Sequence, residues 1–159
     1  TTDPYYYVYG YEGTDVASAM STSSYATYGV LYNWPAVMTE GICPSGWHIP
    51  SDGEFTELTD FLGGVGVAGG KMKDDVQWDG SNSSGWTGLP GGEGYLEVEN
   101  NGVYGVWWTA SDHGYYSWRR SLNSYDDNVD RNENIHLHIG HCFNLNPKRH
   151  IPRPRRLAA

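Results

Sequence analysis

Residues 41–64 read GICPSGWHIPSDGEFTELTDFLGG and contain, in unbroken order, an entry loop, a capped helix and a stop. Ser51 stands where an N-cap residue belongs, and Glu54 follows three residues later, so each side chain can satisfy a free backbone amide of the other. Apolar residues then recur at helical spacing up to Leu62, and the next two glycines provide a left-handed exit. The pattern predicts a helix of about three turns that packs one apolar stripe against a core.

Tryptophans on both sides of this helix are predicted to hold its surroundings in place. Trp47 is expected to pack the entry loop against the core. Residues 63–70 contain too many glycines to predict regular structure, and residues 74–94 read as one long loop. Trp78 and Trp86 lie in that loop, and we expect both to be buried and to pin it.

The rest of the chain predicts turns and short strands. Residues 1–29 have no sustained hydrophobic period, which indicates an extended segment followed by a surface loop. Pro35 bars residues 30–38 from a central strand and favours a short buried turn or an irregular helix. An Asn-Gly step at 101–102 predicts a hairpin turn. Antiparallel strands are expected at 95–98, 103–111, 116–122 and 135–143, with a polar turn at 124–134.

Alternation within the expected strands predicts which side chains face solvent, because successive side chains point to opposite faces. At 116–122 the core face then carries Trp118, Arg120 and Leu122, and the solvent face carries Arg119, Ser121 and Asn123. In the last strand the same alternation turns His136 and His138 outward.

Length and charge limit the classes of function. The 159 residues fit one domain, which we place at 1–147, followed by a basic, proline-containing tail at 148–159. Before Pro147 there are 19 acidic and five basic residues, a formal charge of −14, so this body repels nucleic acid. The chain has no apolar run long enough to span a bilayer, and we expect neither membrane insertion nor a nucleic-acid partner.

Two cysteines, Cys43 and Cys142, stand 99 positions apart. A disulfide between them would tie the loop before the helix to the last strand and stabilise the domain by roughly 4–5 kcal/mol on the chain-entropy account. Two buried free thiols are the alternative, and the spacing does not match a zinc knuckle. We favour the disulfide, which predicts an oxidising compartment.

A series of motifs resembles the major paralogous domain first named from Fibrobacter, which is similar in turn to formylglycine-generating-enzyme-like members of the C-type lectin fold. The motifs are Tyr32-Asn33-Trp34, the run from Cys43 to Asp52, Leu62-Gly63-Gly64, the run from Ala68 to Lys73, the run from Leu89 to Gly92, and the run from Trp107 to Ser111. The resemblance implies an α+β domain with a small twisted antiparallel sheet, one or two helices and extensive loops. It also implies use outside the cytoplasm, at a cell or virion surface.

The stretch 111–142 is similar to a second group with the same fold, the variable proteins of diversity-generating retroelements. In those proteins asparagine codons are mutated at adenines to encode Tyr, Asp, His, Ser or Gly within a fixed framework. The resemblance implies a ligand-binding surface at about 112–138 that recognises a protein or a glycan noncovalently. The implied ligand-binding residues are Asp112, His113, Tyr115, Tyr116, Arg119, Ser121, Tyr125, Asp126, Asp127, Asp130, Asn132, Asn134, His136 and His138. An ordinary polar loop in a structural or adhesive paralogous domain is the alternative.

No catalytic constellation stands out in the sequence. The two cysteines do not sit in the motif through which formylglycine-generating enzymes bind copper, and no nucleophile elbow, phosphate loop or His-Glu-x-x-His is present. His136 and His138 could share zinc with a third histidine, and Asp126, Asp127 and Asp130 could offer calcium ligands, but solvated side chains are the simpler interpretation. We therefore expect a binding domain that is not an enzyme and that uses no metal or other cofactor.

Overall fold

The predicted capping box forms. Helix α4, Asp52–Phe61, begins after Ser51, whose Oγ accepts a hydrogen bond from the Glu54 amide at 3.2 Å while the Glu54 carboxylate accepts one from the Ser51 amide at 2.8 Å. Gly63 and Gly64 follow with φ angles of 105° and 96°, which only glycine adopts at little cost. The helix is therefore confirmed at both ends.

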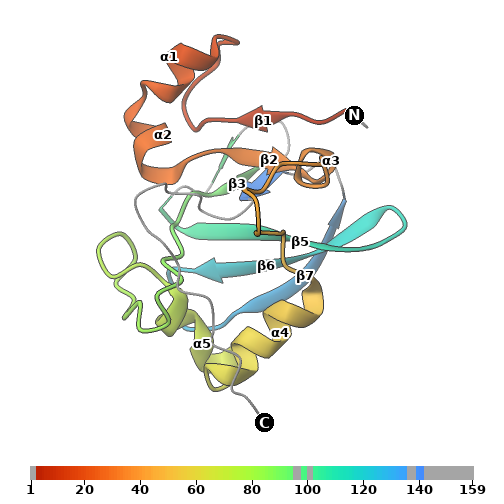
Figure 1. Cartoon of the computed structure of the whole chain (residues 1–159). Coiled ribbons are helices and arrows are strands. Elements are labelled where there is room, and N and C mark those ends of the chain that lie inside the picture. The colour runs from red at the N-terminus through yellow and green to blue at the C-terminus, as the bar shows by residue number, and fades with distance from the viewer. Residues whose placement is uncertain (1–2, 95–97, 100–101, 136–138, 142–159) are drawn as a thin grey trace.

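The computed structural model describes residues 3–94, 98–99, 102–135 and 139–141, and its core is an eight-stranded sheet (Figure 1). The main path through the sheet runs β1-β2-β8-β5-β6-β7, with β3 paired to β4 and β8 beside it. All neighbours are antiparallel except β5 and β8, which meet in one parallel pair. The strands are β1 Tyr6–Tyr7, β2 Leu31–Asn33, β3 Glu93–Gly94, β4 Val98–Glu99, β5 Tyr104–His113, β6 Tyr116–Asn123, β7 Asp130–Ile135 and β8 Ile139–His141.

The predicted α+β class is confirmed, but the helices outnumber the expected one or two. α1, Val16–Met20, α2, Ser23–Tyr28, and α3, Trp34–Val37, gather at the β1–β2 end of the sheet, and α4 and α5, Val65–Met72, lie at the β6–β7 end (Figure 1). The first two helices replace the surface loop expected at 1–29. The two helices are five and six residues long, which is too short for a hydrophobic period to appear in the sequence. Each begins after a residue whose side chain caps it, Asp15 for α1 and Thr22 for α2.

Helix α5 corrects the prediction that residues 63–70 lack regular structure. A Cβ at Gly69 would come within 2.6 Å of the backbone oxygens of Asp127 and Asn128, and the Gly69 amide donates to the Asp127 carbonyl at 2.9 Å. The glycine thus permits a close approach between this helix and a distant loop. Its poor intrinsic helix propensity is outweighed by that tertiary contact.

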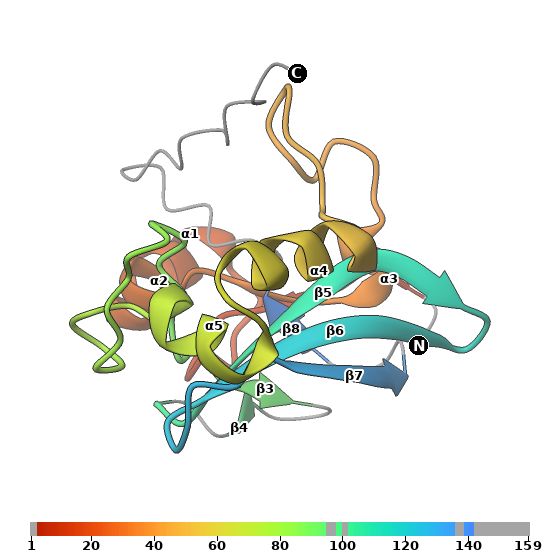
Figure 2. The ribbon, with the colours of Figure 1, turned by 90° about the horizontal axis from the view of Figure 1, so that it is seen from below.

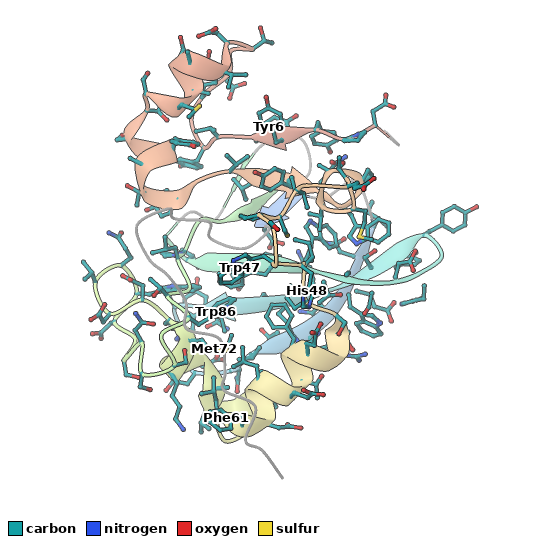
Figure 3. The ribbon with its side chains drawn as sticks, in the orientation of Figure 1. Tyr6, Trp47, His48, Phe61, Met72 and Trp86 are labelled. Atoms are coloured by element: carbon teal, nitrogen blue, oxygen red, sulfur yellow. The ribbon has the colours of Figure 1, made fainter. Side chains whose placement is uncertain are left out.

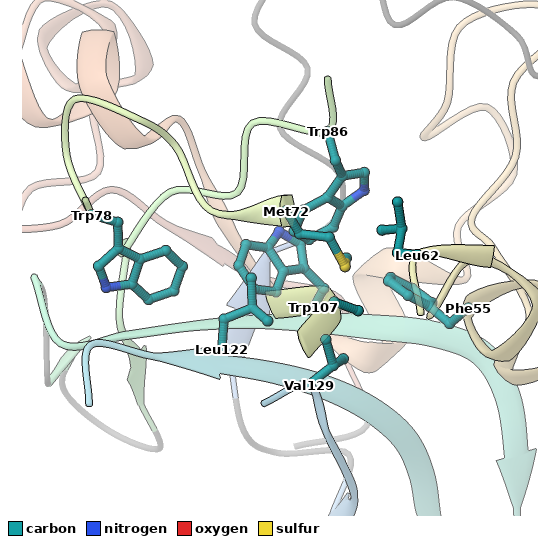
Figure 4. Close-up of a cluster of buried hydrophobic side chains, with 9 residues drawn as sticks. Phe55, Leu62, Met72, Trp78, Trp86, Trp107, Leu122 and Val129 are labelled. Carbon is teal, nitrogen blue, oxygen red and sulfur yellow. The ribbon is translucent and has the colours of Figure 1, made fainter. Parts of the chain in front are cut away.

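Two apolar clusters cover the two faces of β5. Trp107 packs with Phe55, Trp86 and other buried side chains under α4 and α5, as Figure 4 shows. Trp108 points the other way, into a cluster with Val37 and Ile49. Trp78 and Trp86 are both buried, so the prediction that they pin the long loop is confirmed. Figure 2 shows α4 and α5 lying across the sheet at β5 and β6, and β5 is the strand that carries Trp107 and Trp108.

Three further predictions about the chain were wrong in whole or in part. The polar turn expected at 124–134 gives way at Asp130 to strand β7, whose polar residues hide any alternation of apolar side chains. In the run 30–38, the expected short helix is confirmed as α3, where Pro35 lies in the first turn and its missing amide is harmless, but β2 forms immediately before it and lies between two strands of the sheet. Across the expected hairpin, β4 pairs with β3 and not with β5, and residues 100–101 lie outside the described part of the chain.

Trp47 is also placed differently from the prediction. Its side chain is 46% exposed, in the loop before α4 that Figure 3 shows with His48 in front of the sheet. The expected packing role belongs instead to Ile49, which is buried two residues later. Trp47 is therefore a surface residue and not part of the hydrophobic core.

Candidate binding surface

The end of the β5–β6 hairpin, residues 112–116, projects beyond the rest of the sheet (Figure 1), and we call it the hairpin tip. Gly114 occupies the left-handed region with a φ of 84°. Tyr115 and Tyr116 are 86% and 44% exposed, and Asp112 and His113 are also exposed. Four residues predicted to bind a ligand therefore gather at one solvent-facing place.

A shift in strand register fixes the base of the hairpin tip to helix α4. The pairing of β5 with β6 changes register between Trp108 and Asp112, which frees backbone and side-chain groups for other partners. The Ala110 amide donates to the Pro50 carbonyl at 2.9 Å, and the Asp52 amide donates to Ser111 Oγ at 3.0 Å. The loop that carries Trp47 is thus anchored at the foot of the hairpin tip.

Rings and charges from three strands form a row on the α4 side of the hairpin. His113 stacks on Tyr116 with ring centroids 6.1 Å apart and lies 5.4 Å from Trp118. Its Nε2 lies 3.1 Å from Glu133 Oε1 on β7. The ring contacts and the contact with Glu133 together limit how far the exposed imidazole can move.

The row continues into a cluster that joins the sheet to α4, which we call the base cluster: Trp118, Arg120, Arg131 and Asp52. The Arg131 guanidinium lies 3.4 Å from the Trp118 ring centroid, and its Nε and Nη2 both donate to the Asp52 carboxylate. Arg120 is buried and donates to the same carboxylate and to Thr56 Oγ1. One carboxylate on the first turn of α4 thus holds two arginines beneath the hairpin tip.

The pKa of Asp52 reflects this setting. Partial burial of the carboxyl raises the pKa, but hydrogen bonds from Arg131 and Arg120 and their positive charges outweigh that penalty and hold the pKa below its usual range. The charged form is therefore the one that the fold stabilises. This cluster was missed by sequence reasoning, because Asp52 and Arg131 are 79 residues apart and no local pattern connects them.

The opposite face of β6 contradicts the prediction that Arg119, Ser121 and Asn123 point to solvent. Ser121 and Asn123 are buried, and Arg119 is largely covered and paired with Glu93. The strand is therefore enclosed on both faces, which alternation alone cannot reveal. Ser121 has no exposed surface to offer a ligand, whereas the β7 residues Asp130 and Asn134 are half-buried and Asn132 is exposed.

The second group of predicted ligand-binding residues, Tyr125, Asp126 and Asp127, lies at the other end of β6. Eight residues of strand span about 25 Å, so this loop lies well away from the hairpin tip. The residues predicted to bind a ligand thus fall into groups at the two ends of β6, and whether one ligand contacts both groups stays a prediction. His136 and His138 lie outside the described residues, and their placement stays a prediction.

The loop at 123–129 uses its polar groups internally. Asn123 Oδ1 accepts from the amides of Tyr125 and Asp126 at 2.7 and 3.0 Å, and Asp126 Oδ1 accepts from the Asn128 amide at 2.9 Å. The last of these bonds lowers the pKa of Asp126. Buried Lys73 donates to the Asp126 carbonyl from the opposite side. Asn123 and Asp126 thus hold the loop together, while Tyr125, Asp126 and Asp127 are all exposed to solvent.

Neither cysteine nor metal chemistry marks a second site. Cys43 is a half-buried free cysteine whose pKa is raised by burial, and its predicted partner Cys142 lies outside the described residues, so the disulfide stays a prediction. Among residues 3–94, 98–99, 102–135 and 139–141, no three His, Cys, Asp or Glu side chains come together as metal ligands would.

The fold and this surface define an α+β domain that presents an aromatic and charged hairpin tip on a rigid base. A family model described as the Fibrobacter succinogenes major domain matches residues 3–143, so the chain belongs to that family, and the resemblance found in its motifs is confirmed. Comparison with curated proteins and with solved structures gave no match, so the C-type lectin fold and the variable-protein likeness stay predictions. In the part of the chain that the structure describes, no helix is long and apolar enough to cross a bilayer.

Proposed function

We propose that this domain binds a protein or a glycan noncovalently through the hairpin tip, outside the cytoplasm and without catalysing a reaction. The observation that carries the proposal is the exposure of Tyr115 and Tyr116 above the base cluster. Tyrosines offer rigid, amphipathic contact area at a small entropic cost, and nearby Asp and His side chains add adaptable hydrogen bonds. Such a division between anchors and adaptable groups is typical of recognition surfaces.

The rigidity of the base supports the same proposal. Binding is weakened when a surface must be ordered at the moment of contact, so a surface that is already fixed keeps more of its contact energy. At the hairpin tip, His113 is held by Glu133 and by two rings, and Trp118 is covered by Arg131. The exposed side chains therefore stand on a frame that needs no ligand to form.

A finer part of the proposal is that the hairpin tip is diversified as in retroelement variable proteins. All five residues at 112–116 are of types that adenine mutagenesis of an asparagine codon can produce, and all are exposed. Gly114 is also consistent with an asparagine codon in the template, because its backbone is left-handed and asparagine tolerates that conformation better than most residues other than glycine. Buried Ser121 and the loop-building Asp126 are reachable by the same route, but their positions leave little room for exchange, so we leave these two residues out of the diversified set.

The test of binding compares two variants of the whole chain. Tyr115→Ala/Tyr116→Ala alters the hairpin tip, and Tyr125→Ala removes an equally prominent tyrosine at the far end of β6 as a matched control. Each immobilised protein is presented to a glycan array and to extracts of candidate partner cells, and the retained species are identified by mass spectrometry. A partner held by the unaltered chain and by the control, and lost from the double variant, supports the proposal.

Two results would overturn it. Retention of every partner by the double variant would place recognition elsewhere, and the absence of any partner would favour the structural role of a paralogous domain. The diversification is tested at the gene: a near-repeat of the coding segment for 112–138 beside a reverse transcriptase gene is expected, and a single copy with neither excludes it.

A further inference from the structure

Strand β7 forms one margin of the described sheet. It pairs with β6 along its whole length, from Tyr116 opposite Ile135 to Ser121 opposite Asp130, and no other described strand pairs with it. An edge strand presents backbone amides and carbonyls that can pair with another strand, and proteins often place charges there to prevent unwanted pairing. The charges on an edge strand therefore determine which other strands can pair with it.

The order of charges along β7 is complementary to itself. The strand begins Asp130-Arg131-Asn132-Glu133-Asn134. When two such strands run antiparallel about a two-fold axis at Asn132, each Arg131 stands opposite Glu133 of the other copy, and each Asp130 stands opposite Asn134. Opposite charges directly across a strand pair stabilise it, and like charges destabilise it.

Neighbouring registers lose this complementarity. An axis at Arg131 or at Glu133 brings that residue opposite its own copy, so like charges face one another. An axis between two residues is not possible, because directly opposed side chains must project to the same face of the sheet. The register centred on Asn132 alone, among these, forms two ion pairs and no repulsion.

The two charged side chains are exposed and each keeps a group available. Arg131 is 45% exposed at its side chain and uses Nε and Nη2 for Asp52, and no contact of its Nη1 is found among the described residues. Glu133 is 42% exposed and uses Oε1 for His113. Both are held in place by contacts within their own chain, so pairing with a second copy requires little further ordering.

From this complementarity we propose that two copies of the chain associate through their β7 strands, antiparallel and centred on Asn132, to form one continuous sheet. This inference goes beyond the proposed binding function and does not depend on it. The contact is short and polar, so the dimer is weak, depends on concentration and loses affinity as salt screens the two ion pairs. Charge repulsion would reject other strands from the same edge, which makes the pairing selective.

The test uses the residue at the two-fold axis, because a charge placed there faces its own copy. Asn132→Lys and Asn132→Glu each put like charges opposite one another and leave the Arg131 and Glu133 contacts in place. Sedimentation equilibrium of the unaltered chain over a concentration series is expected to show a reversible dimer. Each variant alone is expected to dimerise about fivefold more weakly.

An equimolar mixture of the two variants provides the sharpest readout, since the introduced lysine of one copy then faces the introduced glutamate of the other and association is expected to recover. Asn134→Lys is the register control, because position 134 faces Asp130 and not itself, and it should strengthen the dimer. Circular dichroism melts confirm that each variant is folded. A monomeric unaltered chain at every concentration overturns the proposal, and so does dimerisation of both single variants as strong as that of the unaltered chain.

Discussion

The two ends of β6 carry residues of the same kinds and use them in opposite ways. At the hairpin tip, Asp112, Tyr115 and Tyr116 are exposed to solvent, and the support comes from His113 and from the base cluster beneath them. At 123–129, Asn123 and Asp126 turn back onto their own backbone, and helix α5 approaches closely. A polar, tyrosine-containing turn can thus be a surface for a ligand or a piece of architecture, and the partners of its polar atoms decide which.

The difference also explains how each end tolerates substitution. At the hairpin tip, Asp112, Tyr115 and Tyr116 can change without loss of the contact between His113 and Glu133. At 123–129 the Asn123 and Asp126 side chains accept hydrogen bonds from backbone amides of the loop, so a change of either residue breaks the loop. The comparison predicts a graded series of stability effects, which the following variants test.

Asp52→Ala is expected to have the largest effect. Arg120 is buried, and removal of its carboxylate partner leaves an uncompensated charge in the interior, which costs about 3–5 kcal/mol of unfolding free energy. Asp60→Ala, an exposed position on the same helix, is the control and should stay within about 0.5 kcal/mol of the unaltered chain. Urea unfolding at neutral pH measures both. Equal losses for the two variants would show that the base cluster does not support the hairpin tip.

Gly69→Ala tests the opposite end. A methyl group there would overlap two backbone oxygens that cannot move aside easily, so we expect a loss of about 2 kcal/mol despite the better helix propensity of alanine. Gly66→Ala, on the same helix, meets nothing closer than 3.8 Å and should be neutral or stabilising by up to about 1 kcal/mol. A thermal melt of each variant distinguishes the two. If Gly69→Ala is as harmless as Gly66→Ala, the close approach of α5 to the loop is not real.

Helix α4 could be predicted because its signals are local. A capping residue, its partner three positions later and a closing glycine pair all lie within one short stretch. Helix α5 could not, since the reason for Gly69 lies 58 residues further on, in the loop at Asp127. Strand β7 was hidden for a related reason: its residues are polar, and only pairing with β6 makes it a strand.

The candidate surface was predictable only in its exposed part. Tyr115 follows a glycine in a turn, and such a position is solvent-facing in most proteins. The base cluster joins α4, β6 and β7, and its members carry no shared local signal. Ser121 was predicted to face solvent, but it is buried. Strand alternation tells which face of the sheet a residue is on, but it does not tell whether segments from elsewhere in the chain cover that face.

Acid should weaken the hairpin-tip end through Asp52. Its pKa is lowered in the folded state, so the stability that its charge contributes is fully present above the unfolded value of about 3.9 and is lost as the pH falls through the folded value. In Asp52→Asn this part of the acid sensitivity should disappear, and the remaining slope should come from other carboxyl groups such as Glu54. Urea unfolding from pH 6 downward, compared between the two proteins, measures the difference. Parallel curves would contradict the assignment.

Tyr115→Ala should have the smallest effect on folding. With 86% of its surface exposed, its side chain packs against little, so we expect a change in unfolding free energy within about 0.5 kcal/mol. Tyr125→Ala should cost slightly more, because that ring contacts Tyr104 edge to face at a centroid distance of 6.2 Å. Differential scanning calorimetry of both variants ranks them. A loss above about 1 kcal/mol for Tyr115→Ala would mean that the hairpin tip, like the loop at 123–129, is architecture, and the contrast between the two ends of β6 would fail.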